Sequence, residues 1–154
     1  MSNRKYGRHY ELVEVGEPYP TTKLTSSQDS FNAIRKHFLG QYGTMALTPY
    51  QEHFIIVALD RSNKIISVKT VSTGGIHGTV MDVRIVAKFL IDMLASACIL
   101  AHNHPSGNLK PSAQDDVITK QTKEGLKLLD ILVLDHLIIS DKSFYSYADQ
   151  GRIT

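Results

Sequence analysis

The chain has 154 residues, of which 42% are hydrophobic and 21% are charged, as expected of one globular domain with a buried core. Its formal net charge of +2 is too small to indicate nucleic-acid binding as the main activity, and its single cysteine excludes a disulfide framework or a thiolate metal site. No apolar run approaches the roughly 18 residues of a membrane helix, so we expect a soluble, cytoplasmic protein without a membrane partner.

The first segment, residues 1–24, has early basic residues and two prolines but no sustained periodicity, which predicts a flexible N-terminal arm. A single domain is expected over residues 25–154. Thr25 and Gln28 resemble a capping box, and apolar residues follow at helical spacing as far as Gly40. This pattern predicts the first helix.

Four further elements are predicted from apolar patterning in the middle of the chain. The β-branched runs Glu52–Asp60 and Ile65–Ser72 are separated by a short polar break, which favours a hairpin. Apolar residues at helical spacing over 83–94 predict an amphipathic helix, and Ala97–Ala101 reads as a buried strand.

The last part of the chain continues this alternation of strands and helices. A loop over 102–111 leads into a helix predicted from Ser112 to Leu128, and two strands follow at Ile131–Ser140 and Phe144–Tyr147. Helices that alternate with strands, without internal repeats, favour an α/β sandwich around a mixed sheet.

The most informative residues lie at the junction between the buried strand and the helix after it. His102 and His104 are two residues apart, so on an extended chain both side chains project to the same side. Asp115 lies in the first turn of the helix, from which its carboxylate can return toward the strand end. Catalytic zinc is usually held by three such ligands, with the fourth position open for water. In the alternative interpretation, Ser112 and Asp115 form only a helix capping box, and the two roles can coexist.

A zinc hydrolase also needs a group that takes a proton from the attacking water and gives it to the leaving group. Glu52 is our candidate for this role. Alternation places it on the same face of its strand as Phe54, and a carboxylate on an otherwise apolar face indicates a partner. An exposed carboxylate at a strand end is the plainer alternative.

Taken together, these residues resemble the signature of the JAB/MPN (JAMM) zinc metallopeptidases, which is Glu, then His-x-His-Pro, then Ser-x-x-Asp. Here the signature consists of Glu52, His102, His104, Pro105, Ser112 and Asp115. The string from Leu100 to Ser112, Leu-Ala-His-Asn-His-Pro-Ser-Gly-Asn-Leu-Lys-Pro-Ser, resembles the bacterial RadC-like branch in particular. Gln51–Phe54 and Leu134–His136 resemble that branch as well.

The resemblance implies a cytidine-deaminase-like, three-layer α/β/α fold that binds one zinc ion per chain through His102, His104 and Asp115. It implies Glu52 as the general acid/base and Ser112 as a hydrogen-bond donor to the developing oxyanion. The expected activity is hydrolysis of an amide bond by a zinc metallopeptidase or isopeptidase, with a peptide or isopeptide as substrate.

Two departures from the RadC-like pattern bear on function. We expect the residues before about position 45 to be too few for the N-terminal helix-hairpin-helix region of that branch, and Met81–Arg84 stands where a His-Pro-Arg sequence is common. One alternative function is a DNA-repair-associated accessory or nucleic-acid-binding protein, which the charge does not support. Another is a non-catalytic binding platform with the same fold. A homo-oligomer is compatible with the sequence.

Some other residues carry weaker signals. Cys98 is interpreted as a core thiol, and His136 either as a group that supports a metal ligand or, the favoured interpretation, as a hydrogen-bonded buried imidazole.

Substrate specificity is expected to depend on a loop over 72–81, which includes His77. Lysines also recur on one side of the predicted third helix, and a solvated face explains them better than phosphate binding; they are Lys120, Lys123 and Lys127.

Overall fold

The computed structural model describes residues 22–42, 51–74 and 81–153. Its elements in chain order are α1 (Ser27–Tyr42), β1 (His53–Leu59), β2 (Ile65–Thr73), α2 (Val83–Asp92), β3 (Ala97–Asn103), α3 (Ala113–Lys127), β4 (Leu132–Ile139) and β5 (Phe144–Ser146). None of the described helices is both long and apolar enough to cross a membrane.

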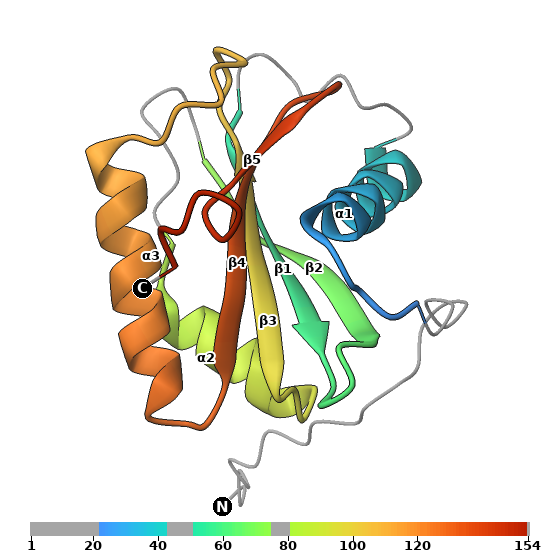
Figure 1. The fold of residues 1–154 in the computed structure, drawn as a ribbon, viewed down its shortest axis with the longest axis vertical. Coiled ribbons are helices and arrows are strands. Elements are labelled where there is room, and N and C mark those ends of the chain that lie inside the picture. The colour runs from blue at the N-terminus through green and yellow to red at the C-terminus, as the bar shows by residue number, and fades with distance from the viewer. Residues whose placement is uncertain (1–21, 43–50, 75–80, 154) are drawn as a thin grey trace, which may run out of the picture.

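The strands form one mixed sheet in the order β2-β1-β3-β4-β5, in which only the β3–β4 pair is parallel. Helix α1 covers one face of this sheet, and α2 and α3 cover the other (Figure 1). This arrangement confirms the predicted three-layer α/β/α class.

Both faces of the central strands are buried, which explains why β1 is apolar from Phe54 to Leu59 and β3 from Ala97 to Ala101. On β1, Ile55 and Val57 pack into the core beneath α1, whereas Phe54 and Ile56 pack with α2 and α3. Cys98 lies in the second core, and burial raises the pKa of its thiol to about 12. The prediction of a core thiol is confirmed.

The start of α1 differs from the predicted capping box. Ser26, rather than Thr25, accepts a hydrogen bond from the backbone N–H of Asp29 (3.1 Å). The Asp29 carboxylate accepts from the backbone N–H of Thr25 at 2.9 Å, in place of any contact through Gln28. A carboxylate is favoured in the first turn because the helix N-terminus carries partial positive charge.

The end of the predicted flexible arm is held against the β1–β2 turn. The N–H of Leu24 donates to the carbonyl of Asn63 at 2.8 Å, and the N–H of Ile65 donates to the carbonyl of Thr22 at 3.2 Å. Leu24 is buried in the core beneath α1. Residues 22–24 of the predicted arm are therefore packed against the domain, and residues 1–21 lie outside the described part of the chain.

Helices α2 and α3 approach closely where α3 has a glycine. A Cβ atom added to Gly125 would lie 3.2 Å from the Cγ1 atom of Val83, which is tighter than ordinary packing. The absence of a side chain at this position lets the two helices share one layer.

The core beneath α2 and α3 should contribute strongly to stability. Leu100 is fully buried there, at 0% exposure, whereas Leu128 is 87% exposed at the end of α3. Leu100→Ala should lower the free energy of unfolding by about 2–5 kcal/mol because it leaves a cavity. The matched Leu128→Ala should change it by less than about 0.5 kcal/mol. Urea unfolding of the metal-free proteins, followed by circular dichroism, measures both, and equal losses would contradict this description of the core.

Candidate metal centre

The two histidines of the signature lie at the carboxyl end of β3, which continues through Asn103, two residues beyond its predicted end. His102 is almost fully buried, with 1% of its side chain exposed, whereas 17% of the His104 side chain is exposed. Their Nε2 atoms are 2.9 Å apart. The predicted convergence of these two side chains on one point is therefore observed.

A tight turn after β3 orients His104. The N–H of Gly107 donates to the carbonyl of His104 at 2.8 Å, and Gly107 has a φ of 73°, a left-handed conformation that suits glycine. Pro105 occupies the second turn position, for which its fixed φ is suited. The turn brings the carbonyl of Asn108 within 2.7 Å of His104 Nδ1. Because a carbonyl only accepts, Nδ1 carries a proton, and in the neutral ring Nε2 is the nitrogen left to bind a metal.

Helix α3 supplies the third group of the site through its first turn. Ser112 is the N-cap and forms a capping box with Asp115: Ser112 Oγ accepts from the N–H of Asp115, and Asp115 Oδ2 accepts from the N–H of Ser112 at 2.7 Å. The same carboxylate reaches both imidazoles, with Oδ1 3.0 Å from His102 Nε2 and Oδ2 3.2 Å from His104 Nε2. The capping role and the site role coexist in one side chain.

The carboxylate and the imidazoles alter each other's acidity. Burial alone would raise the pKa of Asp115, but hydrogen bonds with His102 and His104 hold it well below its usual range. The hydrogen bond with Asp115 in turn raises the pKa of His104. Asp115 is therefore ionised and provides a negative charge beside the two ring nitrogens.

The geometry of these three groups fits a tetrahedral metal ion. The ligand atoms of His102, His104 and Asp115 all lie within 4.8 Å of one another. Bonds of 2.0–2.1 Å to a tetrahedral zinc ion would separate neighbouring ligand atoms by about 3.3 Å, close to the contacts described above. Two imidazoles and one carboxylate also form a ligand set that leaves one coordination position open.

The structure brings Glu52 to the same end of the sheet. In the antiparallel pairing of β1 with β3, Phe54 lies opposite His102, and continuing this register places Glu52 level with His104. The charge of Glu52 contributes to the raised pKa of His104, after the larger effect of the hydrogen bond with Asp115. The carbonyl of Glu52 also accepts a hydrogen bond from Gly74 at 2.9 Å, which ties its backbone to the end of β2.

Asn103 is a site residue that the sequence analysis did not identify. Its side chain is buried, and its Oδ1 accepts from the N–H of His53 at 2.8 Å, while its Nδ2 donates to the carbonyl of Gln51 at 2.9 Å. The amide therefore holds the backbone on both sides of Glu52. A polar residue inside an apolar strand must find hydrogen-bond partners, and this requirement was the available signal.

His136 contacts a metal-site histidine directly. It lies on β4, fully buried, with its Nε2 2.8 Å from His102 Nδ1 and its Nδ1 2.6 Å from the hydroxyl of Thr119. Burial lowers its pKa well below the ordinary value, so the ring is neutral. His136 is thus a buried, hydrogen-bonded imidazole, as the favoured interpretation predicted. Its partner is His102, so it also contacts a candidate metal ligand, as the other interpretation predicted.

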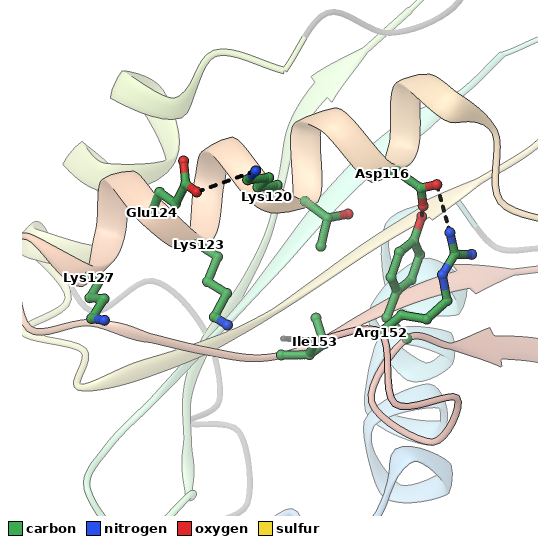
Figure 2. Close-up of a pocket in the computed structure, with 9 residues that line it drawn as sticks. Asp116, Lys120, Lys123, Glu124, Lys127, Arg152 and Ile153 are labelled. Carbon is green, nitrogen blue, oxygen red and sulfur yellow. Dashed lines mark hydrogen bonds and ion pairs between the residues drawn. The ribbon is translucent and has the colours of Figure 1, made fainter.

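The lysines of α3 line a cavity of about 560 Å³ together with residues of the C-terminal segment. Figure 2 shows Asp116 facing Arg152 at one end of this cavity, and the ion pair between them measures 2.6 Å. Lys120 lies 3.9 Å from Glu124 on the same helix. The carboxylate next to Asp115 is thus engaged with the C-terminal segment rather than with the histidines.

The segment that departs from the RadC-like pattern forms a helix cap. Asp82 is the N-cap of α2, and its carboxylate accepts from both the backbone and the guanidinium of Arg84. Of the loop predicted to set specificity, residues 75–80, including His77, lie outside the described part of the chain.

Comparison with known proteins places this architecture in a family. A model of the RadC-like JAB domain matches residues 24–152. A UPF0758 protein of Flavobacterium johnsoniae is 44% identical over 129 residues, which are 84% of this chain and 53% of that protein. A UPF0758 protein of Caldanaerobacter subterraneus subsp. tengcongensis is 37% identical over 145 residues, which are 94% of this chain and 58% of that protein.

The chain therefore spans about half the length of these relatives. The matched region contains the whole His102, His104 and Asp115 cluster together with the sheet that carries it. On these grounds the chain belongs to the RadC-like JAB domain family.

Proposed function

We propose that this domain is a zinc-dependent hydrolase of amide bonds, a metallopeptidase or isopeptidase that acts on a peptide or isopeptide substrate. The observation that supports this most is the convergence of two imidazole Nε2 atoms and an ionised carboxylate at the end of β3. The chain spans about half the length of its relatives. The proposal therefore extends to the activity and the substrates of a whole protein that contains this domain.

His102, His104 and Asp115 would hold the ion. When bound there, zinc supplies Lewis-acid polarisation of the scissile carbonyl and lowers the pKa of the attacking water toward neutrality. The two neutral imidazoles and single carboxylate are suited to this because they cancel only part of the ionic charge. The partial exposure of His104 leaves one side of the cluster accessible.

Glu52 is proposed as the group that moves the proton. Its carboxylate takes a proton from the attacking water and delivers it to the leaving nitrogen, so the amine departs neutral. Its place level with His104 supports this role, as does the backbone held by Asn103 on both sides of it. A fixed backbone limits how far the carboxylate can stray from the reacting atoms.

Ser112 is proposed to stabilise the oxyanion of the tetrahedral intermediate. It is exposed at the N-terminus of α3, beside the ligand Asp115. Its hydroxyl donates to Asp115 Oδ2 at 2.7 Å, so it would have to turn toward the substrate to play this part. The backbone N–H of Ser112 also donates to Oδ2 and would keep the carboxylate in place during that movement.

Metal binding can be tested with two adjacent carboxylates. Asp115→Ala should abolish binding because it removes a ligand, whereas Asp116→Ala removes only contacts with Tyr147 and Arg152 and should keep near one zinc ion per chain. Mass spectrometry of metal content after zinc loading and desalting measures both variants. Full occupancy in Asp115→Ala would contradict the ligand set.

Glu52→Gln should keep zinc but lower hydrolysis by at least about 10²-fold, since the amide cannot accept the proton. Fluorogenic peptide amides and peptides linked through the ε-amine of lysine are suitable substrates. Glu124→Gln, on the exposed face of α3, is the matched control and should leave the rate unchanged. Unchanged turnover in Glu52→Gln would remove the acid/base role. A zinc-loaded wild type inactive on every substrate would instead favour a binding platform.

Asn103→Ala should lower kcat by about 10²-fold, because Glu52 loses the clamp on its neighbouring backbone, while zinc occupancy stays near that of the wild type. Asn32→Ala, an exposed asparagine on α1, is the control. Steady-state kinetics with parallel metal analysis separates positioning from metal loss. A rise in KM alone, with kcat intact, is the result that this role does not allow.

A further inference from the structure

A chain of short hydrogen bonds behind the metal centre connects two of its ligands. The hydroxyl of Thr119 lies 2.6 Å from the backbone carbonyl of Asp115 and 2.6 Å from His136 Nδ1. His136 Nε2 lies 2.8 Å from His102 Nδ1. The chain therefore runs from the helix turn that carries one ligand, through β4, to the ring of another ligand on β3.

The direction of these hydrogen bonds is fixed at the Asp115 end. A carbonyl oxygen has no proton, so a hydroxyl at 2.6 Å from it must be the donor. The single proton of Thr119 is therefore used on Asp115. In the contact with His136, the Thr119 oxygen must therefore be the acceptor. His136 Nδ1 is the donor and carries the proton.

The donor at His136 Nδ1 determines in turn which atom is the donor between His136 and His102. A neutral imidazole has one N–H, so with Nδ1 protonated, His136 Nε2 can only accept. The proton of the contact with His102 must then belong to His102 Nδ1. In the neutral ring that a metal ligand requires, His102 Nε2, the atom that faces Asp115 and His104, is then the nitrogen left to bind a metal.

We propose that Thr119 and His136 are positioning residues that fix the tautomer of His102, so that its Nε2 atom is held ready as a metal ligand. This inference rests on the proposed metal site. The arrangement excluded is the reverse one, in which His136 donates to His102 and the single proton of the neutral His102 ring lies on Nε2. That arrangement would place a proton where the metal binds.

The surrounding rings keep His136 in place. It stacks on Tyr147 with ring centroids 5.1 Å apart and an interplanar angle of 13°, and the Phe54 ring lies 5.6 Å away on a tilt. A ring enclosed in this way, with no exposed surface, cannot turn over to exchange its two nitrogens without disturbing the core.

The two imidazoles are thus oriented by different means. His104 is held by a single bond to the carbonyl of Asn108 on an exposed loop. His102, which is buried, is oriented through side chains from β4 and α3. Partners of this kind commonly contribute 10- to 100-fold to metal affinity.

Thr119→Val tests the proposal because it keeps the shape of the side chain and removes the hydroxyl. Zinc affinity, measured by competition with a chromophoric chelator, should fall about 10- to 100-fold. Thr119→Ser restores the hydroxyl and should recover most of the affinity. Thr122→Val is the matched control, since Thr122 is buried on the same helix and donates to the carbonyl of Ile118 in the same way.

A second measurement needs no metal. Long-range ¹H–¹⁵N correlation spectra of the metal-free protein, recorded at mildly alkaline pH, report which nitrogen of each imidazole is protonated. The wild type should show His102 and His136 protonated on Nδ1. In Thr119→Val, both tautomers of this pair should be populated, whereas Thr122→Val should match the wild type.

The two readouts separate failure of this proposal from failure of the metal site. A wild-type His102 with a bare Nδ1 overturns the proposal, and so does a folded Thr119→Val that keeps both wild-type affinity and a wild-type spectrum. If the wild type binds no zinc, the proposed function fails, yet the spectra still decide the direction of the hydrogen bonds from Thr119 to His102. If Thr119→Val does not fold, the wild-type spectrum alone decides it.

Discussion

The antiparallel pairing of β1 with β3 is the constraint on which the site depends. It is the centre of the sheet, buried on both faces, and its register determines which residue of β1 stands beside each residue of β3. Because Phe54 lies opposite His102, the register places Glu52 level with His104. The side chain of Asn103 holds the backbone on both sides of Glu52. Main-chain hydrogen bonds thus bring the general base candidate and the histidines to the same end of the sheet.

Helix α3 meets this strand end through a cap that has two tasks. The Asp115 carboxylate satisfies the free N–H of Ser112 and also faces two imidazoles, so helix initiation and site assembly use the same atoms. A ligand on a flexible loop would lose conformational entropy each time the site formed. Here the fold itself has already ordered it.

Patterns local in sequence predicted most of this molecule. Apolar patterning, with the start signal at Ser112 for α3, was enough for the described helices and strands. The spacing of His102, His104 and Asp115 was enough for the cluster, because those residues lie on consecutive elements. The contact of His136 with His102 could not be predicted in this way. It depends on β4 lying parallel to β3, an order of strands that no short-range pattern contains. The cap of α1 was misplaced because adjacent residues, Thr25 and Ser26, are both good caps.

The close approach of α2 and α3 at Gly125 has a consequence for the dimensions of the metal centre. Gly125 and Asp115 lie on one rigid rod, about 15 Å apart at 1.5 Å per residue. A Cβ atom at position 125 would require the Val83 side chain to give way by a few tenths of an ångström, and α3 would be displaced where it cannot. A movement of the rod changes the span between Asp115 and the histidines, which are fixed to the sheet. The absence of a side chain at position 125, remote from the histidines, therefore helps to keep Asp115 in its place beside them.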